Sequence, residues 1–291
     1  MELDKLNPRN PSNSEVNDYY TQCHSIYNAK WTPESHQANI HLGYYDKEHS
    51  KYGPAADNMK QIFADLINLS ANDRVLDCSG GLGDNATWIA REYGAKTIGV
   101  NINRLQLGLA RELAIDRNVK SLTEFRHDDF TQLETVENDS VDVVWAIESI
   151  CYAEDKRDFL EQAKRVLKPK GRIVISDWFL DQRDFSKIEQ FIMRKWLEGW
   201  KVPNYAHIDD FRENLSQLGF KNIRRQDATE NTLPSARVLY LFSLWDYPLS
   251  KVLNAVGLRE QLRLENTTAI HYMYYAYKLR LITYSIVAAK L

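Results

Sequence analysis

The sequence predicts an α/β protein in which helices cover both faces of a mostly parallel sheet. Two observations carry this prediction. Helical stretches alternate with short apolar runs between residues 58 and 178, and three of these runs are rich in Val and Ile. Strands that alternate with helices are joined by right-handed crossovers, so the strands run parallel and helices lie on both faces.

The expected elements follow one another along the chain. Residues 1–57 are polar and Tyr-rich, with prolines between short helical patterns, and predict an N-terminal helical cap. The core is expected at 58–229 and 278–291, with a helical substrate segment at 179–210, and the aromatic, amphipathic stretch 230–277 predicts a helical lid insertion. The strand candidates with the clearest pattern are RVLDCS, AKTIGVNI, SVDVVWAIES, GRIVISDW, GFKNIRRQDAT and TYSIVAAKL.

The composition excludes several classes of protein. With 44% hydrophobic residues, 26% charged residues and a net charge of −3, the chain is typical of a soluble globular protein, and no apolar stretch is long enough to span a bilayer. It has no basic block that would neutralise phosphates, so we expect no nucleic-acid partner. The start lacks the layout of a signal peptide and the three cysteines lack paired spacing, so we expect a cytoplasmic location; a homodimer stays open.

The segment RVLDCSGGLGDNATWIA predicts a strand that ends at Asp77, a glycine-rich turn, and a helix that begins near Asn85. Glycine lets a ligand approach the backbone because it has no Cβ. The spacing Gly81-Leu-Gly83-x-x-Ala86 also fits a dinucleotide fingerprint, and a tight turn without any ligand would look the same.

Five sequence blocks in a fixed order help to decide what the glycine-rich turn binds. The blocks lie in four segments, RVLDCSGGLGDN, AKTIGVNINRLQLGLAR, FRHDDFTQLE and SVDVVWAIESICYAEDKRDFLEQAKRVLKPKGRIVISDW, the last of which holds two blocks. They resemble the motifs of class I S-adenosylmethionine-dependent methyltransferases. The likeness is greatest to the small-molecule branch that includes sterol, tocopherol and natural-product methyltransferases, in which NIHLGYYDKE is similar to an aromatic segment over the cofactor. The resemblance covers about residues 15–230 and implies a Rossmann-like, doubly wound, seven-stranded sheet, S-adenosyl-L-methionine as cofactor, and a small-molecule acceptor.

The resemblance also implies the residues that hold the cofactor. Asp77, Ser79, Gly81 and Gly83 would surround its methionine end, although the family usually has Gly in place of Ser79. Asn101 stands where an acid commonly binds the ribose; an amide can donate and accept there, and the missing acid weakens a nicotinamide interpretation. The other expected contacts are Tyr19, Ile102, Gln106, Asp129, Phe130 and Ala146.

Two carboxylates are candidate catalytic groups. Glu148 follows an apolar strand, which places it at the sheet edge where parallel sheets bind ligands. The segment AIES is similar to sterol- and prenyl-type C-methyltransferases, and Cys151 and Tyr152 stand where many O-methylating relatives have a histidine. Glu148 could instead only fix its loop. Asp177 is the second candidate, and it could instead cap the next helix.

The remaining ligand-type residues give weaker patterns. Aromatic residues of the expected cap and lid could wall a dry pocket and stabilise a cation, although helix packing alone would explain the run 272–277. The imidazoles and thiol of the N-terminal region lack the spacing of a zinc site, so we expect no metal. The aromatic set is Tyr19, Tyr20, Tyr27, Tyr44, Tyr45, Trp196, Trp200, Tyr272, Tyr274 and Tyr275, and the set without metal spacing is Cys23, His24, His36, His41 and His49.

The sequence therefore predicts a methyltransferase that acts on a small molecule. We favour methyl transfer to carbon of an apolar, isoprenoid-like or aromatic acceptor in secondary metabolism. Transfer to nitrogen or oxygen of a small metabolite is the alternative. Because of the departures at Ser79 and Asn101, a non-methylating protein that keeps the cofactor structurally also stays open.

Overall fold

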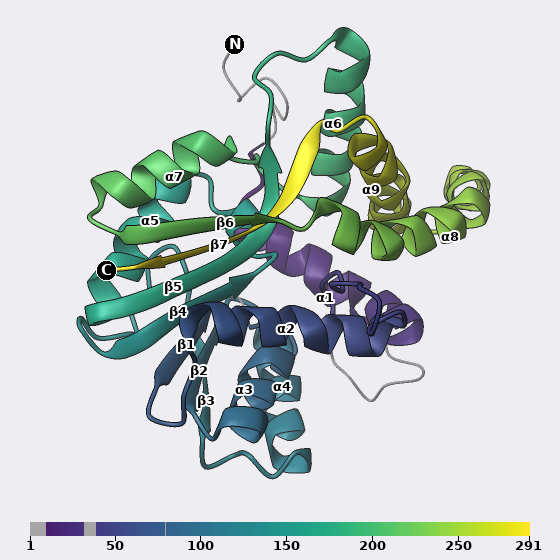
Figure 1. The fold of residues 1–291 in the computed structure, drawn as a ribbon. Helices are drawn as coiled ribbons and strands as arrows, with labels where there is room; N and C mark the ends of the chain where they lie inside the picture. The colour runs from purple at the N-terminus through teal and green to yellow at the C-terminus, as the bar shows by residue number, and fades with distance from the viewer. Residues whose placement is uncertain (1–9, 32–38, 79) are drawn as a thin grey trace.

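The computed structural model describes residues 10–31, 39–78 and 80–291, with side chains described from 10 to 22 in the first of these ranges. A seven-stranded sheet of order β3-β2-β1-β4-β5-β7-β6 forms its centre (Figure 1). Every pairing is parallel except the two made by β7, which is antiparallel to β5 and to β6. The predicted Rossmann-like, mostly parallel sheet is confirmed. The strands are β1 (Arg74–Cys78), β2 (Lys96–Asn101), β3 (Thr123–His127), β4 (Val141–Ile147), β5 (Leu167–Leu180), β6 (Lys221–Asp227) and β7 (Ile282–Lys290).

Apolar side chains of β4 point alternately to the two faces of the sheet, which explains why helices cover both faces. Val143 and Trp145 pack in one buried cluster with Phe63 of α2 (Tyr52–Ile67), whereas Val144 and Ala146 pack in a second cluster with Phe159 of α5 (Lys156–Val166). Figure 1 shows α2, α3 and α4 on one side of the sheet, and α5 and α7 on the other. The helices are α1 (Asn13–Trp31), α2 (Tyr52–Ile67), α3 (Asp84–Tyr93), α4 (Arg104–Asp116), the 3₁₀ turn η2 (Ile150–Tyr152), α5 (Lys156–Val166), α6 (Lys187–Trp200), α7 (Ile208–Gln217), α8 (Thr229–Ala255) and α9 (Gln261–Lys278).

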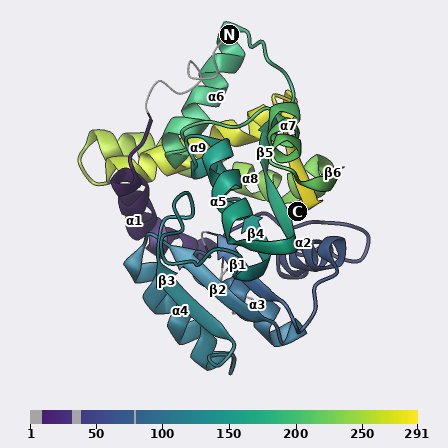
Figure 2. The ribbon, with the colours of Figure 1, turned by 90° about the vertical axis from the view of Figure 1, so that its left-hand side faces the viewer.

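The segments expected as cap and lid surround one end of the sheet. The stretch 230–277 folds as α8 and α9 between β6 and β7, and α9 lies between α6 and α8 (Figure 1). In the N-terminal region, α1 lies beside the ends of β2 and β3 (Figure 2), while residues 39–51 form no helix. Since α2 begins at Tyr52, the expected boundary at residue 58 falls inside a helix. Among the described helices, none combines the length and the apolar character needed to cross a membrane.

Candidate functional site

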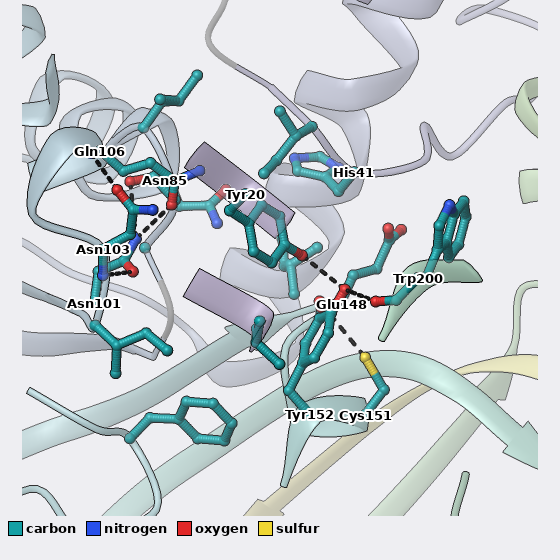
Figure 3. A pocket seen from close by; sticks show the side chains of 18 of the residues that line it. Tyr20, His41, Asn85, Asn101, Asn103, Gln106, Glu148, Cys151, Tyr152 and Trp200 are labelled. Atoms are coloured by element: carbon teal, nitrogen blue, oxygen red, sulfur yellow. Dashed lines mark hydrogen bonds between the residues drawn. The ribbon is translucent and has the colours of Figure 1, made fainter. Parts of the chain in front are cut away.

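A pocket opens at the carboxyl ends of β1, β2, β3 and β4, beneath α1 and the segment 39–42. This is the edge at which open parallel sheets bind ligands. Its lining residues come from both halves of the chain and are shown in part in Figure 3. They are Asn13, Val16, Asn17, Tyr20, 39–42, 80–82, Asp84, Asn85, 101–103, Gln106, 128–131, Ile147, Glu148, Cys151, Tyr152, Trp178, Trp200, Val202 and Leu239.

The glycine-rich loop joins β1 to α3 and forms one wall of this pocket. Gly81 lines the pocket with φ +48°, a left-handed conformation that favours glycine. Gly83 does not line it: with φ +84°, it packs against α4, where an added Cβ would lie 2.7 Å from the Cβ of Ala110. Gly83 therefore shapes the turn from behind, whereas Gly80 and Gly81 leave room for a ligand. Ser79 lies outside the described residues.

Asp77 lies beneath this loop rather than on the pocket surface. Its side chain is fully buried, and neither carboxylate oxygen makes a hydrogen bond of normal geometry. Burial raises the pKa of Asp77 to about 7, although nearby Asn85 and the Ala86 amide lower it. An added Cβ at Gly80 would come within 2.9 Å of the Asp77 carboxylate. A buried acceptor under a glycine, next to the unpaired Oδ1 of Asn85, fits the ammonium of a methionine group.

Asn101 organises the neighbouring wall, at the end of β2. Its Nδ2 donates to Oε1 of Gln106 at 2.8 Å and to the carbonyl of Gly81 at 3.3 Å, while its Oδ1 accepts from the Asn103 amide at 2.8 Å. An aspartate could not make the two donations, which gives a physical reason for the amide. Asn103 caps α4 by accepting from the Gln106 amide. Gln106 and Asn103 line the pocket together with Ile102, as Figure 3 shows in part.

The far end of the pocket is formed by Asp129 and Phe130, which follow β3. One oxygen of Asp129 accepts from the amide and hydroxyl of Thr131, and the other accepts from Nδ2 of Asn13 at 2.6 Å. An adenine amino group would therefore have to share Asp129 with the first residue of α1. This contact also holds the start of α1 at the pocket edge.

Two expected cofactor contacts lie elsewhere. Ala146 points into the buried cluster on the other face of β4, and the pocket is lined by its neighbour Ile147. Tyr19 is fully buried and accepts a hydrogen bond from Asn266 of α9. Its neighbour Tyr20 lines the pocket instead, because one residue along a helix turns the side chain by about 100°.

Glu148 is the residue that turns the chain out of β4 into the pocket. It adopts φ +50°, a conformation that costs a non-glycine residue on the order of 1–2 kcal/mol. Its Oε1 accepts from the Leu42 amide and from the Tyr284 hydroxyl, both at 2.8 Å. Burial raises the pKa of Glu148 to about 8, despite the two donors that favour its charged form. In Figure 3 its carboxylate points into the pocket space that His41 and Trp200 also line.

Asp177, the second candidate carboxylate, does not line the pocket. It lies in β5 opposite Ser285 and is fully buried, and burial raises its pKa. One oxygen accepts from the Cys151 amide and the other from the Trp178 amide. The expected catalytic contact is therefore wrong for this position, as is the expected helix cap, because β5 continues to Leu180. Asp177 holds the turn that follows Glu148.

His41 is a pocket residue that sequence reasoning missed. Its Nδ1 lies 2.9 Å from the carbonyl of Leu42, and since a carbonyl only accepts, Nδ1 carries the proton. Nε2 is then an acceptor, and it is buried without a hydrogen bond. Burial, together with the nearby Lys60 ammonium, lowers the pKa of His41 to about 4. The available signal was its position within NIHLGYYDKE.

Other ligand-type residues are dispersed. Within 10–22, 39–78 and 80–291, no three His, Cys, Asp or Glu side chains are grouped as metal ligands. Cys23, His24 and His36 lie outside the described side chains. Cys78 and Cys151 are both buried and unpaired with another cysteine.

Aromatic side chains wall the side of the pocket near Glu148. The Tyr20 hydroxyl donates to the Tyr152 hydroxyl at 2.9 Å, which donates to the carbonyl of Trp200 at 3.2 Å. Trp178 and Trp200 lie 5.7 Å apart between ring centroids. Of the aromatic residues expected around the acceptor, Tyr20 and Trp200 line the pocket, whereas Tyr19, Tyr44, Tyr45, Trp196, Tyr272, Tyr274 and Tyr275 do not; Tyr27 lies outside the described side chains.

Comparisons with known proteins agree with this arrangement. Residues 76–175 match the family model described as a methyltransferase domain. The chain is 30% identical over 250 residues to 2-methyl-6-phytyl-1,4-hydroquinone methyltransferase of Synechocystis sp., covering 78% of this chain and 74% of that protein. Among solved structures, the [4+2]-cyclase SpnF has a TM-score of 0.75 at 19% identity, with 96% of each chain covered. Geranyl diphosphate C-methyltransferase of Streptomyces coelicolor A3(2) has a TM-score of 0.67 at 16% identity, with 94% and 97% covered.

The family model falls on the strands that build the pocket, and the hydroquinone methyltransferase aligns well beyond them. The residues under and around the glycine loop fit the methionine and ribose parts of the expected cofactor. The chain belongs to the class I S-adenosylmethionine-dependent methyltransferases that act on small molecules.

Proposed function

We propose that the enzyme transfers the methyl group of S-adenosyl-L-methionine to a carbon atom of an apolar, unsaturated small molecule, isoprenoid-like or aromatic, in secondary metabolism. The observation that carries this proposal is the wall near Glu148. Tyr20, Tyr152, Trp178 and Trp200 line the same pocket as the carboxyl group of Glu148, whose pKa burial raises to about 8. Aromatic faces and one carboxylate suit an acceptor that gains positive charge during the reaction.

The cofactor would lie along the other side of the pocket. Asn101, Asn103 and Gln106 form a polar wall for its ribose, and Gly80 and Gly81 let its methionine part approach the Asp77 and Asn85 side chains. When bound, the cofactor supplies an electrophilic methyl group on sulfur. The side chains named here bind and orient it, which is most of what methyl transfer requires of a protein.

In its ionised form, whose population grows as the pH rises through about 8, Glu148 would stabilise charge on the acceptor and then take its proton. The cofactor would supply the methyl carbon, with the electron pair of the old bond left on its sulfur, and the π electrons of the acceptor would form the new carbon–carbon bond. The acceptor carbon skeleton would become cationic and would lose a proton, which Glu148 would receive. Both hydrogen bonds to Glu148 end on Oε1, so Oε2 is the oxygen that can reach the acceptor. Tyr284 and the Leu42 amide hold the carboxylate in place.

Two comparisons support an apolar acceptor. The Synechocystis relative is named for a phytyl-substituted hydroquinone, and the Streptomyces coelicolor structure for C-methylation of geranyl diphosphate. The experiment is incubation with S-adenosyl-L-methionine and a panel of prenylated quinols, acyclic isoprenoid alkenes and small amines. Release of S-adenosylhomocysteine with the alkenes or quinols, together with a product heavier by one methylene unit, is expected. Turnover of the amines alone would contradict the proposal.

Methyl transfer to oxygen or nitrogen is the second candidate, and His41 favours it. Its unpaired Nε2 would accept a hydrogen bond from a hydroxyl or an amine in the pocket. A third possibility, a non-methylating reaction, is favoured by the likeness in fold to the cyclase SpnF. A product formed without S-adenosylhomocysteine would identify that third case.

A further inference from the structure

Helix α8 buries the wrong face for a helix on the surface of a globular protein. Its buried residues include Thr232, Ser243, Asp246 and Ser250. Its exposed residues include Trp245, which is 84% exposed, and Val238, which is 64% exposed. Surface helices normally turn apolar residues inward and polar residues outward. The orientation of α8 is the reverse of this pattern.

Specific hydrogen bonds fix this orientation. Asp246 accepts from Nη1 of Arg259 at 2.9 Å and from the Thr267 hydroxyl of α9 at 2.7 Å. The Ser243 hydroxyl lies 3.0 Å from Nδ1 of His271, also on α9. Rotating α8 to bury its apolar face would break these hydrogen bonds and leave Thr267 and His271 of α9 without their partners, which is unfavourable for buried polar groups. The apolar face is therefore held outward.

Phe242 and Leu244 are exposed on other sides of α8. Six further exposed apolar residues, the last of them the C-cap Val256, follow one line, which we name the α8 stripe. They recur every three or four residues, so they share one side of the helix. The stripe runs about 27 Å along the helix, from the rise of 1.5 Å per residue. In Figure 1, α8 projects from the body of the molecule on the side away from the sheet. The stripe consists of Val238, Leu241, Trp245, Leu249, Val252 and Val256.

The charges beside the stripe indicate what covers it. Arg237 and Lys251 are the basic residues of α8, and both are exposed. Asp246 is buried with Arg259, and Glu230, at the far end of the helix, pairs with Arg280. A helix with an apolar face, an exposed Trp and basic flanks suits the surface of an anionic lipid bilayer.

The size of the stripe disfavours a second copy of the chain. A strip 27 Å long and about 10 Å wide presents on the order of 300 Å². A stable interface takes about 800 Å² from each partner. The homodimer left open by the sequence would therefore need much more surface than the stripe provides.

We propose that α8 docks this enzyme on an anionic membrane surface, with the stripe in the interface between headgroups and acyl chains. The same helix contributes Leu239 to the pocket wall, next to Val238 of the stripe. An apolar acceptor dissolved in lipid would thus have a short path to the pocket. This last step, though not the docking itself, rests on the proposed function.

The test is flotation of the full chain with vesicles of phosphatidylcholine and phosphatidylglycerol, compared with phosphatidylcholine alone. Leu249→Glu, at a position 51% exposed, is the test variant. Ile115→Glu, 53% exposed on α4, is the matched control. We expect the wild type to float with anionic vesicles, and Leu249→Glu to lower the partition coefficient by at least about tenfold, since burial of one Leu is worth that much or more. Ile115→Glu should change it less than about twofold, because surface substitutions away from a contact have small effects.

Three results would overturn the docking proposal. One is a wild type that stays unbound to anionic vesicles. Another is an equal loss of binding in Ile115→Glu. A third is a dimer in sedimentation that Leu249→Glu dissociates while no vesicle binding is seen, which would identify a second copy as the occupant. Failure of the proposed function is separate: vesicle binding would persist, while no detergent-dispersed apolar acceptor would be methylated.

Discussion

Replacement of Glu148 by Gln should stabilise the protein and disable it at the same time. A carboxyl group whose pKa is raised from 4.5 to about 8 holds its proton more tightly in the folded state than in the unfolded chain. That contribution to stability is fully present below pH 4.5 and is lost as the pH rises to about 8. Glutamine keeps an oxygen for the Leu42 amide and the Tyr284 hydroxyl, but it does not titrate.

The size of the change in stability follows from the shift in the pKa of Glu148. Each pKa unit corresponds to 1.36 kcal/mol, so a shift of this size amounts to at most about 5 kcal/mol, and relaxation of the surrounding residues would reduce it to a few kcal/mol. The free energy of unfolding of Glu148→Gln, relative to wild type, should therefore rise by a few kcal/mol between pH 5 and pH 8. Turnover should fall by roughly 10²-fold or more, the loss typical when one electrostatic contributor is deleted.

The assay is urea denaturation of both proteins at pH 5 and pH 8, with cofactor affinity measured in parallel. Asp77 and Asp177 also titrate in this range and are present in both proteins. Because the charge of Asp177 helps to raise the pKa of Glu148, the difference between the two profiles reports Glu148 together with this coupling. Cofactor affinity should change little. Parallel stability profiles would refute the reasoning about burial, and full turnover in the variant would refute the catalytic role.

Three further predictions test other parts of the site. Gly81→Val should abolish binding of S-adenosylhomocysteine in calorimetry, whereas Gly219→Val, at a positive φ with no atom within 4 Å of an added Cβ, should bind normally; equal affinity in both would contradict the role of the loop. His41→Phe should change turnover of a carbon acceptor by only a few-fold, and it should lower turnover of a hydroxyl acceptor by more than about tenfold, as expected when a hydrogen-bond acceptor is lost. Hydrogen exchange in 13–31 and 230–277 should slow when cofactor and acceptor are added, because Tyr20 and Leu239 line the pocket; unchanged exchange would argue against a cover.

The sequence predicts the sheet well because most of its strands can be recognised from the local pattern of apolar residues. β1, β2 and β4 are runs of apolar residues that end where pocket residues begin, and the second half of β5 is a similar run. Strands of a parallel sheet are buried on both faces, so nearly all of their residues are apolar and the run can be recognised without knowing which elements pack against it. The order of strands and the glycine loop follow from the ordered motifs.

The site is predicted less completely. The periodic pattern of a helix or strand shows which residues share a face, but it does not show which face points to the pocket. Tyr19 and Tyr20 differ by one position on α1, and only contacts with Asn266 and Tyr152 decide which one faces the pocket. The same holds for Ala146 and Ile147 on β4, where alternation is clear but the facing side depends on α5.

His41 and Asp177 were misjudged for a different reason. His41 reaches the pocket because the extended segment 39–42 crosses the sheet edge, which no local pattern reveals. Asp177 has the residue type and the position of a catalytic acid, yet the Cys151 amide of the turn at 150–152 binds one of its oxygens and the neighbouring Trp178 amide binds the other. For α8, the sequence indicates an amphipathic helix but not that its polar face is the buried one.

The most direct test of the account uses S-adenosyl-L-methionine labelled with ¹³C in its methyl group. After turnover of a prenylated quinol or an isoprenoid alkene, the labelled carbon of the product is located by NMR. The account predicts a ¹³C methyl signal coupled to a carbon of the acceptor skeleton, and loss of that signal in Glu148→Gln. A labelled methyl group on oxygen or nitrogen would contradict it and would assign the acceptor to the side of the pocket where His41 offers its free Nε2.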